Sequence, residues 1–589
     1  MRLLSLVAAV CCGLLAAPVF AQYGDSANDS GGPLRPEQAT FDVIFYDLHL
    51  AIRPESRSIE GVLEMHADIV APTDVLVLDL DDALTVDDVT VNGTRSLDLF
   101  DPGTGMHLRA TGRGTARRME PFTHEAGVLR IPLGRTAQPG ERLTAKVRYG
   151  GQPVVAPNPP WDGGFTWAEN ADGQPWIAVS CQGEGADLWW PVKDHPSDEP
   201  DSMRIALTVP SDLRAIANGA FDGRMDNGDG TATETWLVST PINNYGVSFG
   251  VGPYEEVIAD YKSPAGYTMP VTFYVLPERV ADGIRQLPGF LDSIAFLERT
   301  FGPYGFRRDG YKILHTPYLG MEHQSLIAYG STFEDNDFGF DWLHFHELAH
   351  EWWANLGTAP DWRDFWIHES FANYAEALYA EDLARRNGED PDAAYLAYIG
   401  QVRPNLRNVQ PVAPVEPRTT KQMYNLPDGS FNGDIYFKGS WFLHTLRFLM
   451  DDDEAFFRSL RRILYPDSAL EAATDGSANR FVSTADVQKV FEDEANRDLS
   501  AYFTVYLRQP DLPRLTVDRA GERVTLRWHT PEGALPPDAP FELPVEVSVG
   551  GDMQRVAMPG GVATFTVDQD ASFEIDPDGR ILFDDSVLP

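Results

Sequence analysis

The sequence predicts a multidomain α+β protein, in which a β domain precedes a mainly helical domain and a small β-sandwich follows. The 589 residues exceed what one hydrophobic core holds. The contents of 43% hydrophobic and 11% aromatic residues are those of a globular chain. The hydrophobic period changes from that of strands to that of helices near residue 260, and back near residue 509. We therefore expect domains at 41–260, 261–508 and 509–589.

The first 21 residues have the pattern of a secretory signal peptide. Arg2 supplies the positive charge, an apolar run extends from Leu3 to Ala17, and Val19-Phe20-Ala21 predicts cleavage before Gln22. Residues 22–40 are rich in Gly, Ser, Asp and Pro, so we expect a flexible lead-in. No later run reaches the ~18 apolar residues of a membrane span. We expect an exported protein, periplasmic or extracellular.

Short alternating runs predict the strands of the first domain. The run Phe41–Leu50 alternates with period two, and Asn92-Gly93 is a typical turn between such runs. Further runs lie near 60–70, 75–80, 86–91, 127–132, 142–148, 203–209 and 233–238.

The middle domain shows helical periodicity. Helices are predicted near 277–301 with an interruption at Pro288, and near 340–356, 366–387, 437–450, 453–463 and 484–507. After residue 509, runs such as Arg523–Trp528 alternate again and predict a small β-sandwich.

Charge and cysteine content exclude several classes of function. The formal net charge of −41 argues against nucleic-acid binding and against docking to anionic lipid. Cys181 is the one cysteine outside the predicted signal peptide. It therefore has no partner for an intrachain disulfide, and we expect it to be a small buried side chain.

The pentapeptide from His346 to His350 has the form H-E-x-x-H. On a helix, residues four apart share one face, so both imidazoles can reach one ion. The flanking residues Phe345 and Trp352 are apolar and predict that this helix is buried. Burying two imidazoles and a carboxylate costs free energy unless these groups share a partner. The sequence therefore predicts one zinc ion per chain, with Glu347 as the base that activates water.

A catalytic zinc needs a third protein ligand from elsewhere in the chain. Glu369 follows His350 by nineteen residues, which allows the first helix to end near Leu356 and a second helix to pack against it. His368 is the alternative ligand. Glu376 lies seven residues past Glu369 on the same helical face, and we expect it to support a ligand imidazole.

This arrangement resembles the M1 family of gluzincin aminopeptidases. The family's H-x-W-x-G-N continuation is similar to His350–Asn355, which implies a supporting role for Asn355. Its N-E-G stands here as His368-Glu369-Ser370. The resemblance covers about residues 41 to 508 and implies an N-terminal β saddle and a thermolysin-like catalytic domain. The large helical C-terminal domain of many members is absent, so we expect an open cleft or closure by a second subunit of a dimer.

An upstream segment resembles the family's exopeptidase motif G-x-M-E-N. Aligned on Met321-Glu322, the sequence reads Leu319-Gly320-Met321-Glu322-His323, with His323 in the position of the motif's Asn. The resemblance implies that Glu322 holds the substrate ammonium. Gly320 and Met321 would line the substrate as an added β-partner.

Two further residues match family positions. Gln182, in Cys181–Gly185, stands at the position of a second ammonium contact, and Glu184 is the competing choice. Tyr436, in the sequence Tyr-Phe-Lys-Gly, is similar to the Y-x-K-G tyrosine that donates a hydrogen bond to the oxyanion.

Together these features predict an enzyme that hydrolyses the N-terminal bond of peptides with a free amino terminus. Three alternatives stay open. The chain could be an endopeptidase of the same fold, carry epoxide hydrolase activity beside peptidase activity, or be an inactive peptide-binding module.

Overall fold

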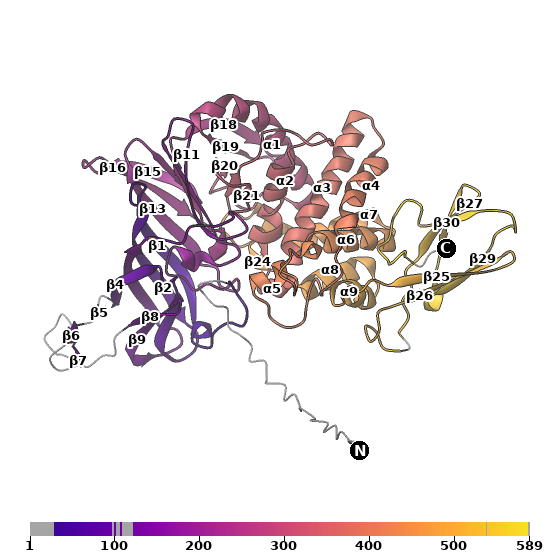
Figure 1. Cartoon of the computed structure of the whole chain (residues 1–589), viewed down its shortest axis with the longest axis horizontal. Helices are drawn as coiled ribbons and strands as arrows, with labels where there is room; N and C mark the ends of the chain where they lie inside the picture. The colour runs from indigo at the N-terminus through magenta and orange to yellow at the C-terminus, as the bar shows by residue number, and fades with distance from the viewer. Residues whose placement is uncertain are drawn as a thin grey trace, which may run out of the picture.

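The computed structural model describes residues 29–92, 94–96, 99–101, 106–108, 122–537 and 539–586. The predicted signal peptide lies outside the described residues. Figure 1 shows a β-rich region, a helical region and a small group of strands following one another along the long axis. This arrangement confirms the multidomain α+β fold class.

The first region is built on an eight-stranded sheet with the order β15-β16-β13-β1-β2-β10-β4-β5. β1 pairs with β13 in parallel, and its other neighbour, β2, is antiparallel to it. Alternate residues of β2 are buried, as the period of two predicted. The strands are β1 (Phe41–Arg53), β2 (Ser58–Ile69), β4 (Leu84–Val91), β5 (Thr94–Ser96), β10 (Arg142–Gly151), β13 (Ser202–Pro210), β15 (Ala220–Asp226) and β16 (Thr231–Val238).

Smaller sheets pack beside it. One of them has the strand order β11-β12-β17-β14. Its strand β12 ends at Ser180, immediately before the loop that carries Gln182. Its strands are β11 (Gly164–Glu169), β12 (Pro175–Ser180), β14 (Arg214–Ala217) and β17 (Phe249–Gly252). The others are formed by β3 (Thr73–Asp79), β8 (Thr123–Glu125) and β9 (Val128–Ala137), and by β6 (Leu99–Asp101) and β7 (Met106–Leu108).

The second region combines helices with a five-stranded sheet that the sequence pattern did not predict. The sheet order is β18-β19-β20-β22-β21, with β18 (Glu255–Lys262), β19 (Thr268–Val275), β20 (Tyr311–His315), β21 (Gly320–Met321) and β22 (Leu326–Tyr329). The helices are α1 (Val280–Phe301), α2 (Trp342–Ala349), α3 (Trp366–Asn387), α4 (Pro391–Val402), α5 (Thr420–Tyr424), α6 (Phe437–Met450), α7 (Asp453–Leu464), α8 (Thr484–Ala495) and α9 (Ser500–Leu507). α3 is central and packs against α2, α4 and α6.

Three predicted helices differ from the observed ones. Pro288 does not interrupt α1, which extends from Val280 to Phe301 with the proline inside it. The carbonyl that Pro288 leaves without a helical partner belongs to Ile284, whose side chain is exposed. The helix predicted to reach 356 ends at Ala349 and continues as a π-helical turn, η5 (Glu351–Leu356). The helix predicted at 484–507 is divided, because Asn496 adopts a left-handed conformation and ends α8.

The C-terminal strands form two three-stranded sheets, β25-β26-β29 and β28-β27-β30. The hydroxyl of Tyr506 in α9 donates to the carbonyl of Leu582 at 2.7 Å and ties this region to the helices. In the part of the chain that the structure describes, helices long and apolar enough to cross a bilayer are absent. The strands are β25 (Arg514–Ala520), β26 (Arg523–His529), β27 (Val545–Val549), β28 (Asp552–Val556), β29 (Val562–Thr566) and β30 (Phe573–Ile575).

Candidate metal centre and active site

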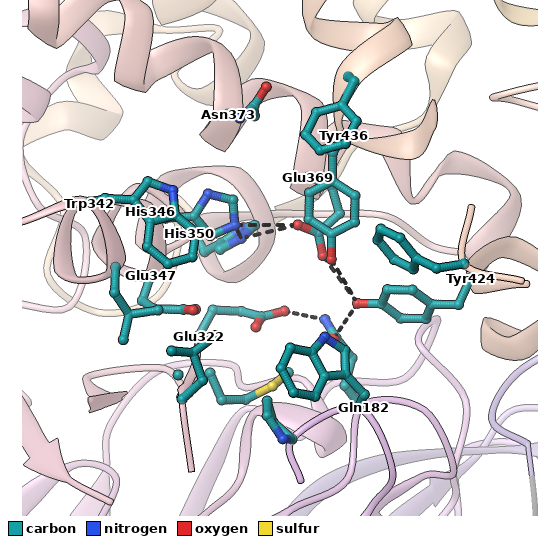
Figure 2. Close-up of a pocket in the computed structure, with 18 of the residues that line it drawn as sticks. Gln182, Glu322, Trp342, His346, Glu347, His350, Glu369, Asn373, Tyr424 and Tyr436 are labelled. Atoms are coloured by element: carbon teal, nitrogen blue, oxygen red, sulfur yellow. Dashed lines mark hydrogen bonds and ion pairs between the residues drawn. The ribbon is translucent and has the colours of Figure 1, made fainter. Parts of the chain in front are cut away.

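Two buried helices bring the predicted metal ligands together. Asp341 caps the start of α2 by accepting from the backbone N–H of His344, and His346 and Glu347 lie on the buried part of that helix. His350 forms the C-terminal cap of α2, and Glu369 lies in the first turn of α3. Figure 2 shows the two imidazoles and the Glu369 carboxylate pointing toward one another.

The distances within this group suit a tetrahedral metal ion. The Nε2 atoms of His346 and His350 lie 3.2 Å apart, and Glu369 Oε2 lies 3.6 and 3.5 Å from them. Zinc bonds of about 2.0–2.1 Å in a tetrahedral site place two ligand atoms about 3.3 Å apart. The three lone-pair atoms therefore match the edges of such a site, and all three side chains are buried.

The Nδ1 atom of each imidazole makes a contact that keeps the Nε2 atom of the same ring facing the other ligands. His346 Nδ1 lies 2.6 Å from Glu376 Oε1, and His350 Nδ1 lies 3.0 Å from the carbonyl of Trp353. Trp353 lies in the segment after α2, at a kink where its backbone angles are not helical. Tyr398 in turn donates to the second oxygen of Glu376 at 2.5 Å. The structure thus places Glu376 against a ligand imidazole, where it fixes the ring's orientation.

Burial and neighbouring charges perturb the acids of the site. Burial raises the pKa of the Glu347 carboxyl to about 8, with the nearby carboxylates acting in the same direction. For Glu369, burial is outweighed by the imidazoles of His350 and His346, and its pKa is lowered. A divalent cation among these groups would favour every carboxylate in its charged form.

A second group of buried side chains could also hold a metal ion, and it shares His350 with the first group. Atoms of Glu322, Glu347 and His350 lie within 4.8 Å of one another. The Glu322 carboxylate already accepts from Gln182 Nε2 and from Tyr245, so we assign the metal to the set with two imidazoles. The alternative ligand His368 lies outside both groups, and its Nε2 accepts from a backbone N–H at 2.9 Å.

The residues predicted to hold the amino terminus meet across the interface of two regions. Gln182 comes from the β region and Glu322 from the segment after β21, and Gln182 Nε2 donates to Glu322 Oε1. The competing Glu184 is instead paired with Lys421 at 2.8 Å. The Asn355 side chain contacts the ammonium-site segment, because its Nδ2 donates to the backbone carbonyl of Glu322 at 3.0 Å, and its backbone N–H donates to the carbonyl of His350 at 2.9 Å.

Gly320 and Met321 form the short edge strand β21 beside the base. A Cβ on Gly320 would lie 2.6 Å from Glu347 Oε1 and 2.6 Å from a methyl carbon of Leu343. A side chain at this position would therefore force the ends of the Glu347 and Leu343 side chains to shift. Met321 is buried and lines the same cavity.

Two tyrosines lie beside the metal ligands. Tyr436 precedes α6, and its ring stacks near His346 with the centroids 6.2 Å apart. Its hydroxyl lies 3.3 Å from the hydroxyl of Tyr424, the last residue of α5. Sequence reasoning missed Tyr424, which lies twelve residues before Tyr436 and in no short motif.

One cavity of about 1170 Å³ is lined by the three metal ligands together with Glu347, Glu322, Gln182 and both tyrosines. Three exposed aromatic side chains line it too: Trp161, Trp342 and Phe431 are 56%, 41% and 49% exposed. Exposed aromatic rings around a polar, metal-ligating centre suit a ligand that is partly apolar and several atoms long. Trp342 and Gln182, both labelled in Figure 2, line this cavity together with the metal ligands.

Removing the charge of Glu376 tests the support of His346. We expect Glu376→Gln to weaken zinc affinity about 10- to 100-fold, because the amide holds the imidazole less strongly than a carboxylate. Competition with a chelator measures the affinity. Glu381→Gln on the same helix, whose carboxylate pairs with Arg447, is the control with wild-type affinity. Equal affinities for all three proteins would contradict this role.

A methyl group at residue 320 tests the close approach to the base. We expect Gly320→Ala to retain zinc and to lower kcat about 100-fold on whichever substrate the enzyme cleaves, because it displaces Glu347. Gly400→Ala, whose added Cβ meets nothing within 4 Å, is the control. Turnover of Gly320→Ala at the wild-type rate would show that the base tolerates the added methyl group.

Comparison with known proteins agrees with this geometry. Residues 321–492 match the peptidase family M1 domain. Aminopeptidase B from Homo sapiens is 28% identical over 362 residues, which cover 59% of this chain and 51% of that protein. Aminopeptidase B from Rattus norvegicus is 24% identical over 356 residues, 58% of this chain and 50% of that one. The chain thus spans about half the length of these relatives.

Solved structures share the fold over a longer stretch. The M1 zinc metallopeptidase from Deinococcus radiodurans aligns with a TM-score of 0.60 at 24% identity, covering 81% of this chain and 95% of that one. A mutant of it bound to a Tyr-Ser-Ala substrate aligns with a TM-score of 0.61, covering 84% and 99%. The chain therefore carries a peptidase family M1 domain, within the fold of the M1 zinc metallopeptidases.

Proposed function

We propose that this protein is a zinc-dependent aminopeptidase. One observation carries the proposal: a carboxylate oxygen of Glu322 lies within 4.8 Å of the base Glu347 and of the ligand His350. The main chain of a peptide has one free amino group, on its first residue. Two bonds separate that nitrogen from the first carbonyl carbon. A peptide whose ammonium pairs with Glu322 therefore presents its first carbonyl to the metal ligands. An internal bond has no ammonium at that distance, which disfavours an endopeptidase.

The chain's own groups can carry out the proton transfers of hydrolysis. Zinc held by His346, His350 and Glu369 supplies Lewis-acid catalysis. Glu347 accepts a proton from the attacking water and delivers one to the leaving amine. Tyr436, which lines the same cavity, donates a hydrogen bond to the oxyanion that forms at the carbonyl.

Binding of the peptide uses both main-chain and side-chain groups. The edge strand of Gly320 and Met321 offers backbone partners to an extended substrate. Glu322 and Gln182 hold its amino terminus, and the cavity has room for side chains on either side of the cleaved bond. The aminopeptidases B and the Tyr-Ser-Ala complex of the Deinococcus radiodurans enzyme support a peptide substrate.

Cleavage of blocked and free substrates tests the proposed activity. We expect aminoacyl-aminomethylcoumarins with a free amino group to be cleaved at least about 100-fold faster than their N-acetylated forms, because only the ammonium pairs with Glu322. A chelator should abolish cleavage, and Glu347→Gln should lower kcat about 1,000-fold. Fluorescence release measures all three. Equal rates on blocked and free substrates would contradict the aminopeptidase, and activity surviving both chelation and Glu347→Gln would contradict the zinc mechanism.

We also propose that the protein is exported, on the strength of Arg2, the apolar run after it and Val19-Phe20-Ala21. Mass spectrometry of the protein recovered outside the cytoplasm should find Gln22 as its first residue. Recovery of the uncleaved chain, beginning at Met1, from the cytoplasm would refute export through this segment.

A further inference from the structure

Tyr424 lies where three functional parts of the site meet. Its hydroxyl oxygen is 2.5 Å from Gln182 Oε1, 3.3 Å from Glu369 Oε1 and 3.3 Å from the hydroxyl of Tyr436. The first partner is the amide beside Glu322, the carboxylate proposed to bind the substrate ammonium. The second is a metal ligand, and the third is the tyrosine proposed to donate to the oxyanion. Figure 2 shows Tyr424 reaching toward all three from one side of the cavity.

Counting donors assigns the protons of this group. A phenol has one proton to donate, whereas an amide oxygen and a carboxylate oxygen can only accept. The short contact directs the Tyr424 proton to Gln182 Oε1. The oxygen of Tyr424 is then available to accept, and Tyr436 is the neighbour with a proton to give it. Before substrate binds, Tyr424 therefore holds the Tyr436 O–H in a defined direction.

The orientation of the Gln182 amide is set from its other side. Gln182 Nε2 donates to Glu322 Oε1, and Tyr245 donates to the same oxygen at 3.1 Å. This leaves Gln182 Oε1 facing Tyr424. A continuous series of hydrogen bonds thus joins Glu322 to Tyr436 through Gln182 and Tyr424.

The ring of Tyr424 is held in place by its surroundings. It packs edge-on against Phe365, with the centroids 5.0 Å apart, and lies beside Phe431 at 6.3 Å. Its backbone carbonyl accepts from the N–H of Asn432 at 2.6 Å. The helix α5 is further anchored to the β region, because Lys421 pairs with Glu184. Because the Tyr424 ring is fixed, its hydroxyl can transmit a change in the hydrogen bonding of Gln182 to Tyr436.

We propose that Tyr424 is a positioning residue that couples occupancy of the amino-terminal site to the orientation of the Tyr436 phenol. A substrate ammonium at Glu322 brings new N–H donors to Gln182 Oε1, and these compete with the Tyr424 proton. When the Tyr424 proton leaves Gln182 and turns toward the Tyr436 oxygen, Tyr436 no longer donates to Tyr424, and its O–H is released toward the substrate carbonyl. The inference rests on the proposed aminopeptidase function and adds a coupling between binding and catalysis.

Removing one hydroxyl tests this role. We expect Tyr424→Phe to lower kcat about tenfold on a free-amine substrate while KM changes less than about twofold, because ammonium binding to Glu322 is kept. Tyr506→Phe, which also loses one buried phenol hydrogen bond but lies in α9, is the matched control with wild-type kinetics. Zinc content should be unchanged in both variants.

A double-mutant cycle separates coupling from a structural effect. In a Tyr436→Phe background, Tyr424→Phe should lower kcat less than about twofold further, because the phenol that it orients is gone. An equal tenfold loss in both backgrounds, or wild-type kcat for Tyr424→Phe, would overturn the proposal. If Tyr424→Phe fails to fold, Gln182→Met serves instead: it should lower kcat as well as raise KM, and a change in KM alone would overturn the coupling.

The outcomes also distinguish this inference from the function on which it rests. A wild-type protein that cleaves blocked and free substrates equally contradicts the aminopeptidase. A wild-type protein that requires the free amine, together with an unaffected Tyr424→Phe variant, leaves the aminopeptidase intact and refutes the role of Tyr424.

Discussion

The rest of the site depends on the convergence of two imidazole nitrogens and one carboxylate oxygen at 3.2–3.6 Å inside the protein. Such groups are expensive to bury, and a shared cation offsets that cost. The packing of α2 against α3 holds them, aided by the stacked rings of Trp353 and Phe371 with centroids 4.1 Å apart. Because ligands preorganised in this way bind metal in the folded state, metal binding also stabilises the fold.

In the proposed aminopeptidase, the place of cleavage depends on a different contact, between the β region and the helical region. Gln182 follows a strand of the first and Glu322 follows an edge strand of the second, and they meet in one hydrogen bond. Both regions share a continuous core, in which Leu314 and Met321 pack with side chains of the β region. The amino-terminal site therefore keeps its distance from the metal ligands only while the two regions stay docked.

Local sequence patterns predicted the site residues whose positions depend on local helix geometry. His346 and His350 could be predicted to share one ion, because residues four apart lie on one face of a helix. Glu369 lies on the next helix, and its prediction came from the nineteen-residue gap and the family resemblance. The end of α2 could not be predicted, because the turn from Glu351 to Leu356 is shaped by tertiary contacts. Tyr424 was missed for the same reason: its partners lie 242, 55 and 12 residues away, and a single tyrosine carries no periodic signal.

X-ray absorption at the zinc edge of the purified protein tests whether His346, His350 and Glu369 hold the metal, because it reports the donor atoms of the bound ion. We expect one zinc per chain in a low-coordinate shell of nitrogen and oxygen donors at about 2.0–2.1 Å, with the multiple scattering of two imidazoles. That imidazole signature should weaken in His350→Ala. A protein that retains no zinc, or whose zinc spectrum is the same in wild type and His350→Ala, would contradict this set of ligands.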